Sequence, residues 1–259
     1  MTLHFYKYHG AGNDFIIADA RKTDISLFTP TFVQNICDRH FGIGADGLMI
    51  LLESESADFA MKYFNSDGPE GTMCGNGGRC ITAFAKKMGI IGQSCHFMAV
   101  DGLHFSEILD DGLISLDMNN VNSLTVLTDG ILTDTGSPHF VTQHPDPHLA
   151  EVVNEGRKLR YDKRLGETGA NVNFVSFNHH EIKISTYERG VEDETLACGT
   201  GAVASAISVS KWDGTIYPEY TLFAKGGTLY VSFTKEEDKY TTIKLKGPAT
   251  FVFEGQFYY

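Results

Sequence analysis

The sequence is short of positive charge and of long apolar runs. Its 259 residues contain 21 lysines and arginines against 33 aspartates and glutamates, which gives a formal net charge of −12. A surface of that sign repels nucleic acid and anionic membranes, so neither is an expected partner. The longest aliphatic run, Leu48 to Leu52, is too short to span a bilayer, and residues 1–9 lack an apolar signal-peptide segment. We therefore expect a cytoplasmic protein.

Cysteines and metal-binding motifs are also sparse. The five cysteines are an odd number without a C-x-x-C pair, and the ten histidines include no H-E-x-x-H motif. A chain of this size does not need disulfides for stability, so we expect free thiols in a reducing compartment. The same pattern argues against a metal site. The cysteines are Cys37, Cys74, Cys80, Cys95 and Cys198.

The remaining composition is typical of a globular protein. Hydrophobic residues make up 42% of the chain and charged residues 21%, and no low-complexity tract indicates disorder. The length allows one large domain or two domains of ordinary size.

An internal repeat favours two domains. Cys74 and Cys198 are 124 residues apart, in the similar segments Thr72–Gly78 (TMCGNGG) and Leu196–Ala202 (LACGTGA). The same offset relates Gly12-Asn13 to Gly136-Ser137, Gly47 to Asn171, Asn65 to Arg189, and Glu70 to Glu194. Several landmarks at one offset indicate duplication of a half-chain unit. We predict two related halves, the first ending near Asn119-Asn120.

Each half is predicted to place strands around one helix. The alternating runs Phe59–Phe64 and Ile182–Tyr187 are typical of strands that lead into loops. A helix is expected after each cysteine, over Cys80–Met88 and over Ala202–Val209 as far as Gly214. The second is apolar nearly all round, so strands should enclose it. Further strands are expected at Leu113–Met118, Phe174–Phe177, Leu229–Phe233, Thr242–Leu245 and Phe251–Phe253, and a short helix at Pro30–Arg39.

Both repeat cysteines precede glycines at an expected helix start. Unpaired backbone N–H groups and the helix dipole favour negative charge there, which lowers a thiol pKa and creates a carboxylate site beside the sulfur. A lone cysteine in this position is often only a small buried residue. Two in matching contexts indicate a shared chemical role for Cys74 and Cys198. Cys37, Cys80 and Cys95 are expected in the core.

Two other motifs each allow a functional and a purely structural interpretation. Residues 42–47 match G-x-G-x-x-G, but a helix precedes them and a strand follows, the reverse of the dinucleotide-binding order, so we interpret them as a tight turn. Glu188-Arg189 ends a strand nine residues before Cys198, as Asn65 stands nine residues before Cys74. Such a pair is often solvated surface. Here Arg189 is suited to hold a carboxylate at two points and Glu188 an ammonium group.

Together these residues resemble diaminopimelate epimerases over nearly the whole chain. The matching motifs are Gly12-Asn13-Asp14-Phe15, Arg39–Gly47 (RHFGIGADG), Phe64–Gly68 (FNSDG), Met73–Gly77 (MCGNG), Gly169–Phe174 (GANVNF), Tyr187–Gly190 (YERG), Ala197–Ala202 (ACGTGA), Gly226-Gly227 and Lys246–Ala249 (KGPA).

The resemblance implies an α/β (α+β) fold of two pseudo-symmetric domains. Each is a curved, mostly antiparallel β-sheet or barrel wrapped around a central helix, with the active site in the cleft between them. The expected domains are residues 1–119 with 249–259, and residues 120–248. The implied activity is interconversion of LL- and meso-diaminopimelate, a lysine and peptidoglycan precursor, with no cofactor. The resemblance also implies a homodimer.

The resemblance assigns roles residue by residue. Cys74 and Cys198 act as base and acid, and His139 supports Glu188. The residues expected to bind the reacting carboxylate are Gly75, Asn76, Gly199 and Thr200, and those expected to hold the distal amino-acid end are Asn13, Asn65, Asn171, Glu188 and Arg189. Two positions depart from the family. Ser137 replaces a common Asn and Gly47 a Gln of some members, which bears on substrate affinity rather than reaction type.

Inverting a carbon requires groups on both of its faces. Two sulfurs within roughly 3 to 3.5 Å of the carbon lie about 6 to 7 Å apart, and two helix N-termini stabilise the developing enediolate. The nearest alternative is a proline or hydroxyproline racemase of the same architecture. A thiol redox protein or thiol transferase, and a noncatalytic amino-acid-binding protein, are alternatives of other classes.

Overall fold

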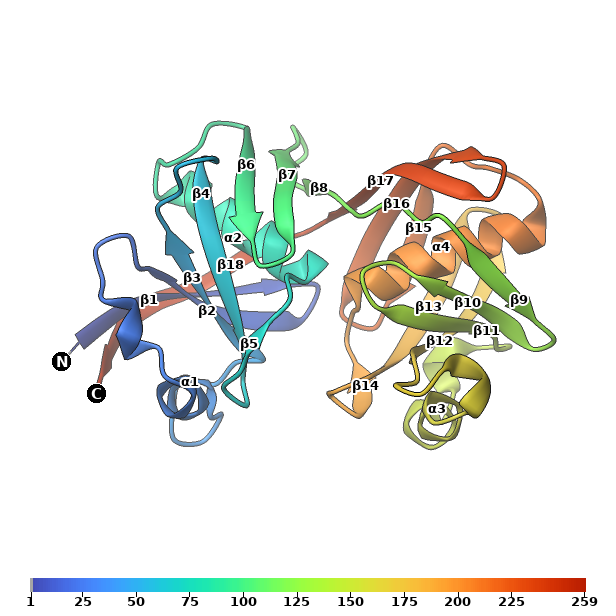
Figure 1. Cartoon of the computed structure of the whole chain (residues 1–259), viewed down its shortest axis with the longest axis horizontal. Coiled ribbons are helices and arrows are strands. Elements are labelled where there is room, and N and C mark those ends of the chain that lie inside the picture. The colour runs from blue at the N-terminus through green and yellow to red at the C-terminus, as the bar shows by residue number, and fades with distance from the viewer. Residues whose placement is uncertain (1) are drawn as a thin grey trace. The chain divides into compact units, whose positions relative to one another are not determined.

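The computed structural model describes residues 2–259, whose strands and helices fall into two units (Figure 1). The first comprises the chain up to Leu116 together with Pro248–Tyr259, and the second comprises Asp117–Gly247. Among residues 2–259, no helix is long and apolar enough to cross a membrane.

The first unit is a sheet with two helical crossovers. Its strand order is β18 (Thr250–Tyr258), β1 (Thr2–Gly10), β2 (Asn13–Asp19), β3 (Gly47–Leu52), β4 (Phe59–Asn65), β6 (Ser94–Ala99), β7 (Gly102–Ile108) and β8 (Ile114–Asp117), with β5 (Glu70–Gly71) on β4. The pairs β2–β3 and β4–β6 are parallel and the others antiparallel. Parallel neighbours need a crossover connection. The first crossover contains η1 (Ile25–Leu27) and α1 (Pro30–Cys37), and the second contains α2 (Gly75–Lys87).

The second unit repeats this order strand for strand. It runs β9 (Leu124–Leu127), β10 (Gly130–Asp134), β11 (Pro138–Gln143), β12 (Asn171–Asn178), β13 (Glu181–Glu188), β15 (Tyr220–Ala224), β16 (Gly227–Glu236) and β17 (Lys239–Gly247), with β14 (Asp193–Thr195) on β13. Again the two pairs with helical crossovers, β11–β12 and β13–β15, are parallel. The crossovers contain η2 (Pro147–Leu149), α3 (Val152–Arg160) and η3 (Lys163–Leu165), and then α4 (Gly199–Asp213). The shared topology explains the 124-residue repeat.

Each unit packs its sheet around its second crossover helix. α2 contacts β1, β2, β3, β7 and β18, and α4 contacts strands from β10 to β17 of its own unit. Figure 1 shows α4 running among these strands. α4 is buried from Gly201 through Ser210 and ends at Gly214, as its apolar sequence predicted. The predicted fold class, two like halves of curved, mostly antiparallel sheet around a central helix, is confirmed.

Several boundaries differ from the sequence predictions. The helix predicted over Pro30–Arg39 ends at Cys37, because the Asp38 carboxylate accepts the N–H groups of His40 and Phe41 at 2.7 Å and holds a turn. α2 and α4 begin at Gly75 and Gly199, earlier than predicted, since their glycines are part of the helix. Strands β12, β16, β17 and β18 extend beyond the predicted runs.

Other expectations are confirmed directly. Cys37, Cys80 and Cys95 are buried core residues. The segment 42–47 lies between α1 and β3, the helix-before-strand order of a tight turn. Lys7 donates to the carbonyl oxygen of Gly44 in that turn.

Candidate functional site

Cys74 is the N-cap of α2. Its backbone is extended (φ −105°, ψ 148°), and its Sγ accepts the Gly77 N–H at an N···S distance of 3.2 Å. A Cβ on Gly77 would lie 3.2 Å from Sγ and 3.1 Å from the sulfur of Met49, so a glycine lets the helix start approach the thiol. First-turn N–H groups and the helix dipole favour the thiolate at this position.

Asn13 and Asn76, both predicted to bind substrate, are brought together in the first unit. The Asn76 amide donates to Asn13 Oδ1 at 3.2 Å, and Asn13 Nδ2 donates to the Asp46 carboxylate at 2.7 Å. Arg39 bridges Asp46 and Asp14 at 2.7 Å to each. The start of β2 is therefore fixed against the first turn of α2.

Asp14 anchors this arrangement. It pairs with Lys7 at 2.6 Å as well as with Arg39. Burial acts to raise the pKa of Asp14, but the hydrogen bonds and charges of Arg39 and Lys7 outweigh it and lower the pKa to about 2. The carboxylate is therefore ionised at neutral pH.

Asn65 ends β4, opposite Gly47 in the strand register. Its backbone N–H donates to the Pro69 carbonyl at 3.0 Å, which closes the loop that leads to Cys74. A Cβ at Gly47 would lie 2.6 Å from the Phe64 carbonyl oxygen, so this backbone arrangement leaves no room for a side chain at position 47.

Cys198 is the N-cap of α4, the counterpart of Cys74. Its backbone is also extended (φ −120°, ψ 117°), and the Thr200 hydroxyl lies 3.4 Å from its sulfur. That hydroxyl is 2.9 Å from Nε2 of His139, and the Thr200 carbonyl accepts the Thr135 hydroxyl at 2.9 Å. The first turn of α4 is thus tied to the β10–β11 connection.

The fully buried His139 ring is held in one orientation. The Asn173 amide oxygen accepts the Thr186 hydroxyl at 2.9 Å, which turns the amide nitrogen toward His139 Nδ1, also at 2.9 Å. Nδ1 is therefore an acceptor and the ring proton is assigned to Nε2. Burial lowers the pKa of His139 to about 3, so the ring is neutral at physiological pH.

Asn171 connects two other predicted residues, Ser137 and Arg189. Its amide nitrogen donates to the Ser137 hydroxyl and the Pro138 carbonyl, both at 3.1 Å, and its oxygen accepts the Arg189 N–H at 2.8 Å. The ends of β11, β12 and β13 meet here because His139 is in register with Asn171 and β13 runs antiparallel to β12. The half-buried Arg189 side chain reaches Thr168 Oγ1 at 3.2 Å.

Glu188, which ends β13, completes the predicted set. That His139 holds the Glu188 side chain in place remains a prediction. The polar contacts of the ring include Asn173, Ser137, Thr200 and Asn171.

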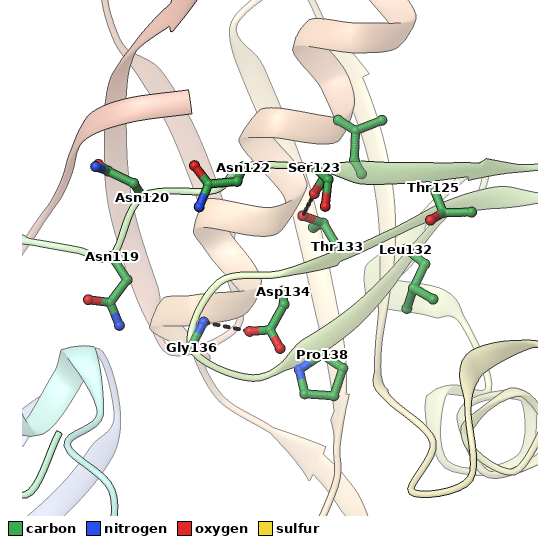
Figure 2. Close-up of a pocket in the computed structure, with 11 residues that line it drawn as sticks. Asn119, Asn120, Asn122, Ser123, Thr125, Leu132, Thr133, Asp134, Gly136 and Pro138 are labelled. Carbon is green, nitrogen blue, oxygen red and sulfur yellow. Dashed lines mark hydrogen bonds between the residues drawn. The ribbon is translucent and has the colours of Figure 1, made fainter. Parts of the chain in front are cut away.

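A pocket of about 500 Å³ lies in the second unit beside the β10–β11 turn. Figure 2 shows the Gly136 amide directed at the Asp134 carboxylate, a 2.9 Å hydrogen bond that shapes the turn carrying Ser137. Asn119, Asn120 and Asn122 line the pocket, and the cysteines do not. We therefore separate this pocket from the predicted substrate site.

The sequence predictions missed three residues that lie around the helix starts at Cys74 and Cys198, namely Arg79, Thr135 and Asn173. Arg79 was the detectable one, because a charged residue stands out among the small residues of its helix. Within residues 2–259, no group of His, Cys, Asp and Glu side chains is placed to hold a metal ion.

The chain matches known proteins over most of its length. Residues 5–124 and 131–252 match the diaminopimelate epimerase family. The chain is 48% identical over 253 residues to a diaminopimelate epimerase of Flavobacterium psychrophilum, with 97% of this chain and 99% of the relative covered. It is 40% identical over 258 residues to that of Chlorobaculum tepidum, with 95% and 98% covered.

Solved structures of more distant proteins share the fold. A PhzF-family phenazine biosynthesis protein of Bacillus anthracis gives a TM-score of 0.78 at 15% identity, with both chains fully covered. A hydroxyproline epimerase of Agrobacterium vitis gives 0.73 at 15% identity, with 98% of this chain and 92% of the other covered. At these identities the likeness concerns the fold alone.

Proposed function

The chain belongs to the diaminopimelate epimerase family, and we propose that it interconverts LL- and meso-2,6-diaminopimelate with Cys74 and Cys198 as its two acid–base groups. The observation that carries the proposal is the pair of cysteines at the N-caps of α2 and α4, in two units of identical strand order. Each thiol stands where backbone N–H groups favour negative charge.

In this proposal Cys74 and Cys198 act on opposite faces of one substrate carbon. One thiolate removes the α-proton, and the opposite thiol returns a proton to the other face. The backbone N–H groups of Gly75, Asn76, Gly199 and Thr200 bind the carboxylate and stabilise the enediolate as it forms. Because either cysteine can begin as the thiolate, the reaction runs in both directions.

Recognition of the distal amino-acid end falls to polar side chains at the strand ends. Arg189 holds the second carboxylate, and Glu188 the second ammonium group. The amide contacts of Asn171 already fix the Arg189 backbone. The remaining residues assigned to this end are Asn13, Asn65 and Ser137.

The runner-up is a proline or hydroxyproline racemase, supported by the shared fold of the hydroxyproline epimerase structure. Such substrates lack a second amino-acid end, so the charged pair Glu188-Arg189 favours diaminopimelate. A thiol redox role is weaker, because Cys74 and Cys198 head separate helices rather than sharing a C-x-x-C turn.

Four expectations from the sequence belong to the same proposal. The enzyme works without a cofactor, resides in the cytoplasm and forms a homodimer. Its domains are residues 1–119 with 249–259, and residues 120–248.

The test is solvent deuterium exchange. Purified protein, dialysed against a chelator, is incubated in D₂O with LL-diaminopimelate or with L-proline, and the α-carbon is followed by NMR and chiral chromatography. We expect meso product with deuterium at one α-carbon, and no exchange into proline. Exchange into proline would support the racemase, and absence of exchange into both would leave a binding or redox protein.

A further inference from the structure

Arg79 of α2 is a fully buried guanidinium without a carboxylate partner among residues 2–259. It donates to the Gly75 carbonyl at 3.1 Å, to Asn76 Oδ1 at 2.9 Å and to the Pro248 carbonyl at 3.3 Å. All three acceptors are uncharged. Burying a guanidinium with only neutral partners is costly, so the charge requires an explanation.

The Arg79 guanidinium remains charged at neutral pH and lies close to the start of α2. Burial lowers the pKa of Arg79 to about 10, and negative charge on Cys80 and Cys74 is what opposes that shift. Burial raises the pKa of Cys80, so that thiol is neutral. The remaining anionic candidate near Arg79 is the thiolate of Cys74.

Other titratable groups lie on α2 and on the strands that it contacts. Burial raises the pKa of Tyr8 as it does that of Cys80. The others on α2 and its neighbouring strands include Lys7 with Asp14, Lys87 with Glu254, Lys86 with Gln93, Asp19 with Arg21, His104 with Asp101, and His9, which accepts the Gly12 N–H. His4, Tyr6 and Glu107 also belong to these strands.

The Cys198 half has a neutral residue at the repeat position of Arg79. Val203 stands at the 124-residue offset from Arg79, and each is the fifth residue of its helix. The groups at the start of α4 include the partly buried Thr200, whose hydroxyl lies 3.4 Å from the Cys198 sulfur, and the buried, neutral His139. The charged groups of that half include Arg189, whose charge acts on His139, Glu188 beside it, and Glu194 paired with Lys225.

We infer that Arg79 is a positioning residue that makes Cys74 the thiolate and Cys198 the thiol of the resting enzyme. The guanidinium supplies a fixed positive charge behind Cys74 and holds the Asn76 side chain. The catalytic meaning of this assignment rests on the proposed function. The pKa values of the two thiols do not depend on the proposed function, because they are measured without substrate.

The test is alkylation by iodoacetamide across a pH series, with each cysteine followed by peptide mass spectrometry. In the wild-type protein we expect a lower midpoint pH for Cys74 than for Cys198. An opposite charge at close range moves such a midpoint by roughly one pH unit or more. In Arg79→Gln, Cys74 should therefore react at least about tenfold more slowly at pH values below its wild-type midpoint, while the Cys198 midpoint stays unchanged.

Arg79→Lys is the matched control, because it keeps the charge and loses the fork of donors. It should leave the Cys74 midpoint close to that of wild type. Equal shifts in the Gln and Lys variants would attribute the effect to hydrogen bonding rather than charge and overturn the inference. A wild-type midpoint for Cys198 at or below that of Cys74 would overturn it without any variant. A wild-type protein in which Cys74 is the more acidic thiol, but which does not turn over diaminopimelate, would instead count against the proposed function.

Discussion

The Thr200 hydroxyl is predicted to donate a hydrogen bond to the Cys198 thiolate. His139 Nε2–H occupies an acceptor site on Thr200 Oγ1 at 2.9 Å, and the hydroxyl proton is then directed at Sγ, 3.4 Å away. The direction of this chain is set by Asn173, which presents its amide nitrogen to Nδ1 of His139. The relay therefore stabilises negative charge on Cys198 whenever that sulfur is a thiolate.

Thr200→Val removes the donor and preserves the shape. A hydrogen bond to a charged group contributes about 1.5 to 3 kcal/mol, so we expect the epimerisation rate to fall roughly 10- to 150-fold. Stability should change by only about 1 kcal/mol, because Ser137 Oγ remains 3.1 Å from Nε2 as an acceptor for the ring proton. Thr200→Ser keeps the hydroxyl and should retain most of the rate.

The assay is turnover of LL-diaminopimelate in both directions, with thermal unfolding of each variant as the control for folding. A Thr200→Val enzyme within twofold of wild type would refute the relay. So would an equal loss in the Ser variant, since that would implicate the methyl group rather than the hydroxyl.

Three further predictions concern the cysteines, the distal end and pH. Cys74→Ala and Cys198→Ala should each abolish epimerisation in both directions, because one thiol cannot serve two faces; substantial turnover by either variant would contradict the assignment. Arg189→Lys should weaken binding of diaminopimelate but leave binding of a monocarboxylic diamine analogue about equal, as measured by calorimetry, whereas a uniform loss would indicate a structural role. Asp14, whose folded pKa of about 2 lies below its ordinary 3.8, contributes stability that is present above pH 4 and lost as pH falls toward 2. Asp14→Asn should therefore lower the free energy of unfolding on the order of 2 kcal/mol at pH 7 and much less near pH 2, and an equal loss at both pH values would exclude this ionisation as the cause.

The parts of the fold that sequence predicted well are those with a local signal. α4 is apolar on every side, and the alternating residues of β4 and β13 have the period of half-buried strands. The two N-cap cysteines could be predicted because the pattern of a cysteine before glycines, which is weak when it occurs once, occurs twice at the repeat offset. Their neighbours Gly75 and Gly199 mark the helix starts in the structure.

The rest depends on tertiary contacts. α3 was not predicted, because its surface is highly charged and of its residues only Val152 and Gly156 are fully buried. The pairing of β1 with β18 joins opposite ends of the chain and leaves no local trace. Asn173 and Arg79 gain their importance from what they face after folding, His139 in one unit and Asn76 in the other.

The central claim is that Cys74 and Cys198 meet at one substrate carbon, and oxidative cross-linking tests it most directly. The proposed mechanism requires the two sulfurs to come about 6 to 7 Å apart around one carbon, and from that separation a small shift or side-chain rotation reaches the roughly 2 Å of a disulfide. Mild oxidation should therefore inactivate the enzyme, yield a Cys74–Cys198 peptide by mass spectrometry, and be reversed by dithiothreitol. Bound diaminopimelate should protect, because it fills the gap between the sulfurs. A dominant Cys74–Cys80 link, or an equal rate of cross-linking with and without diaminopimelate, would contradict the shared site.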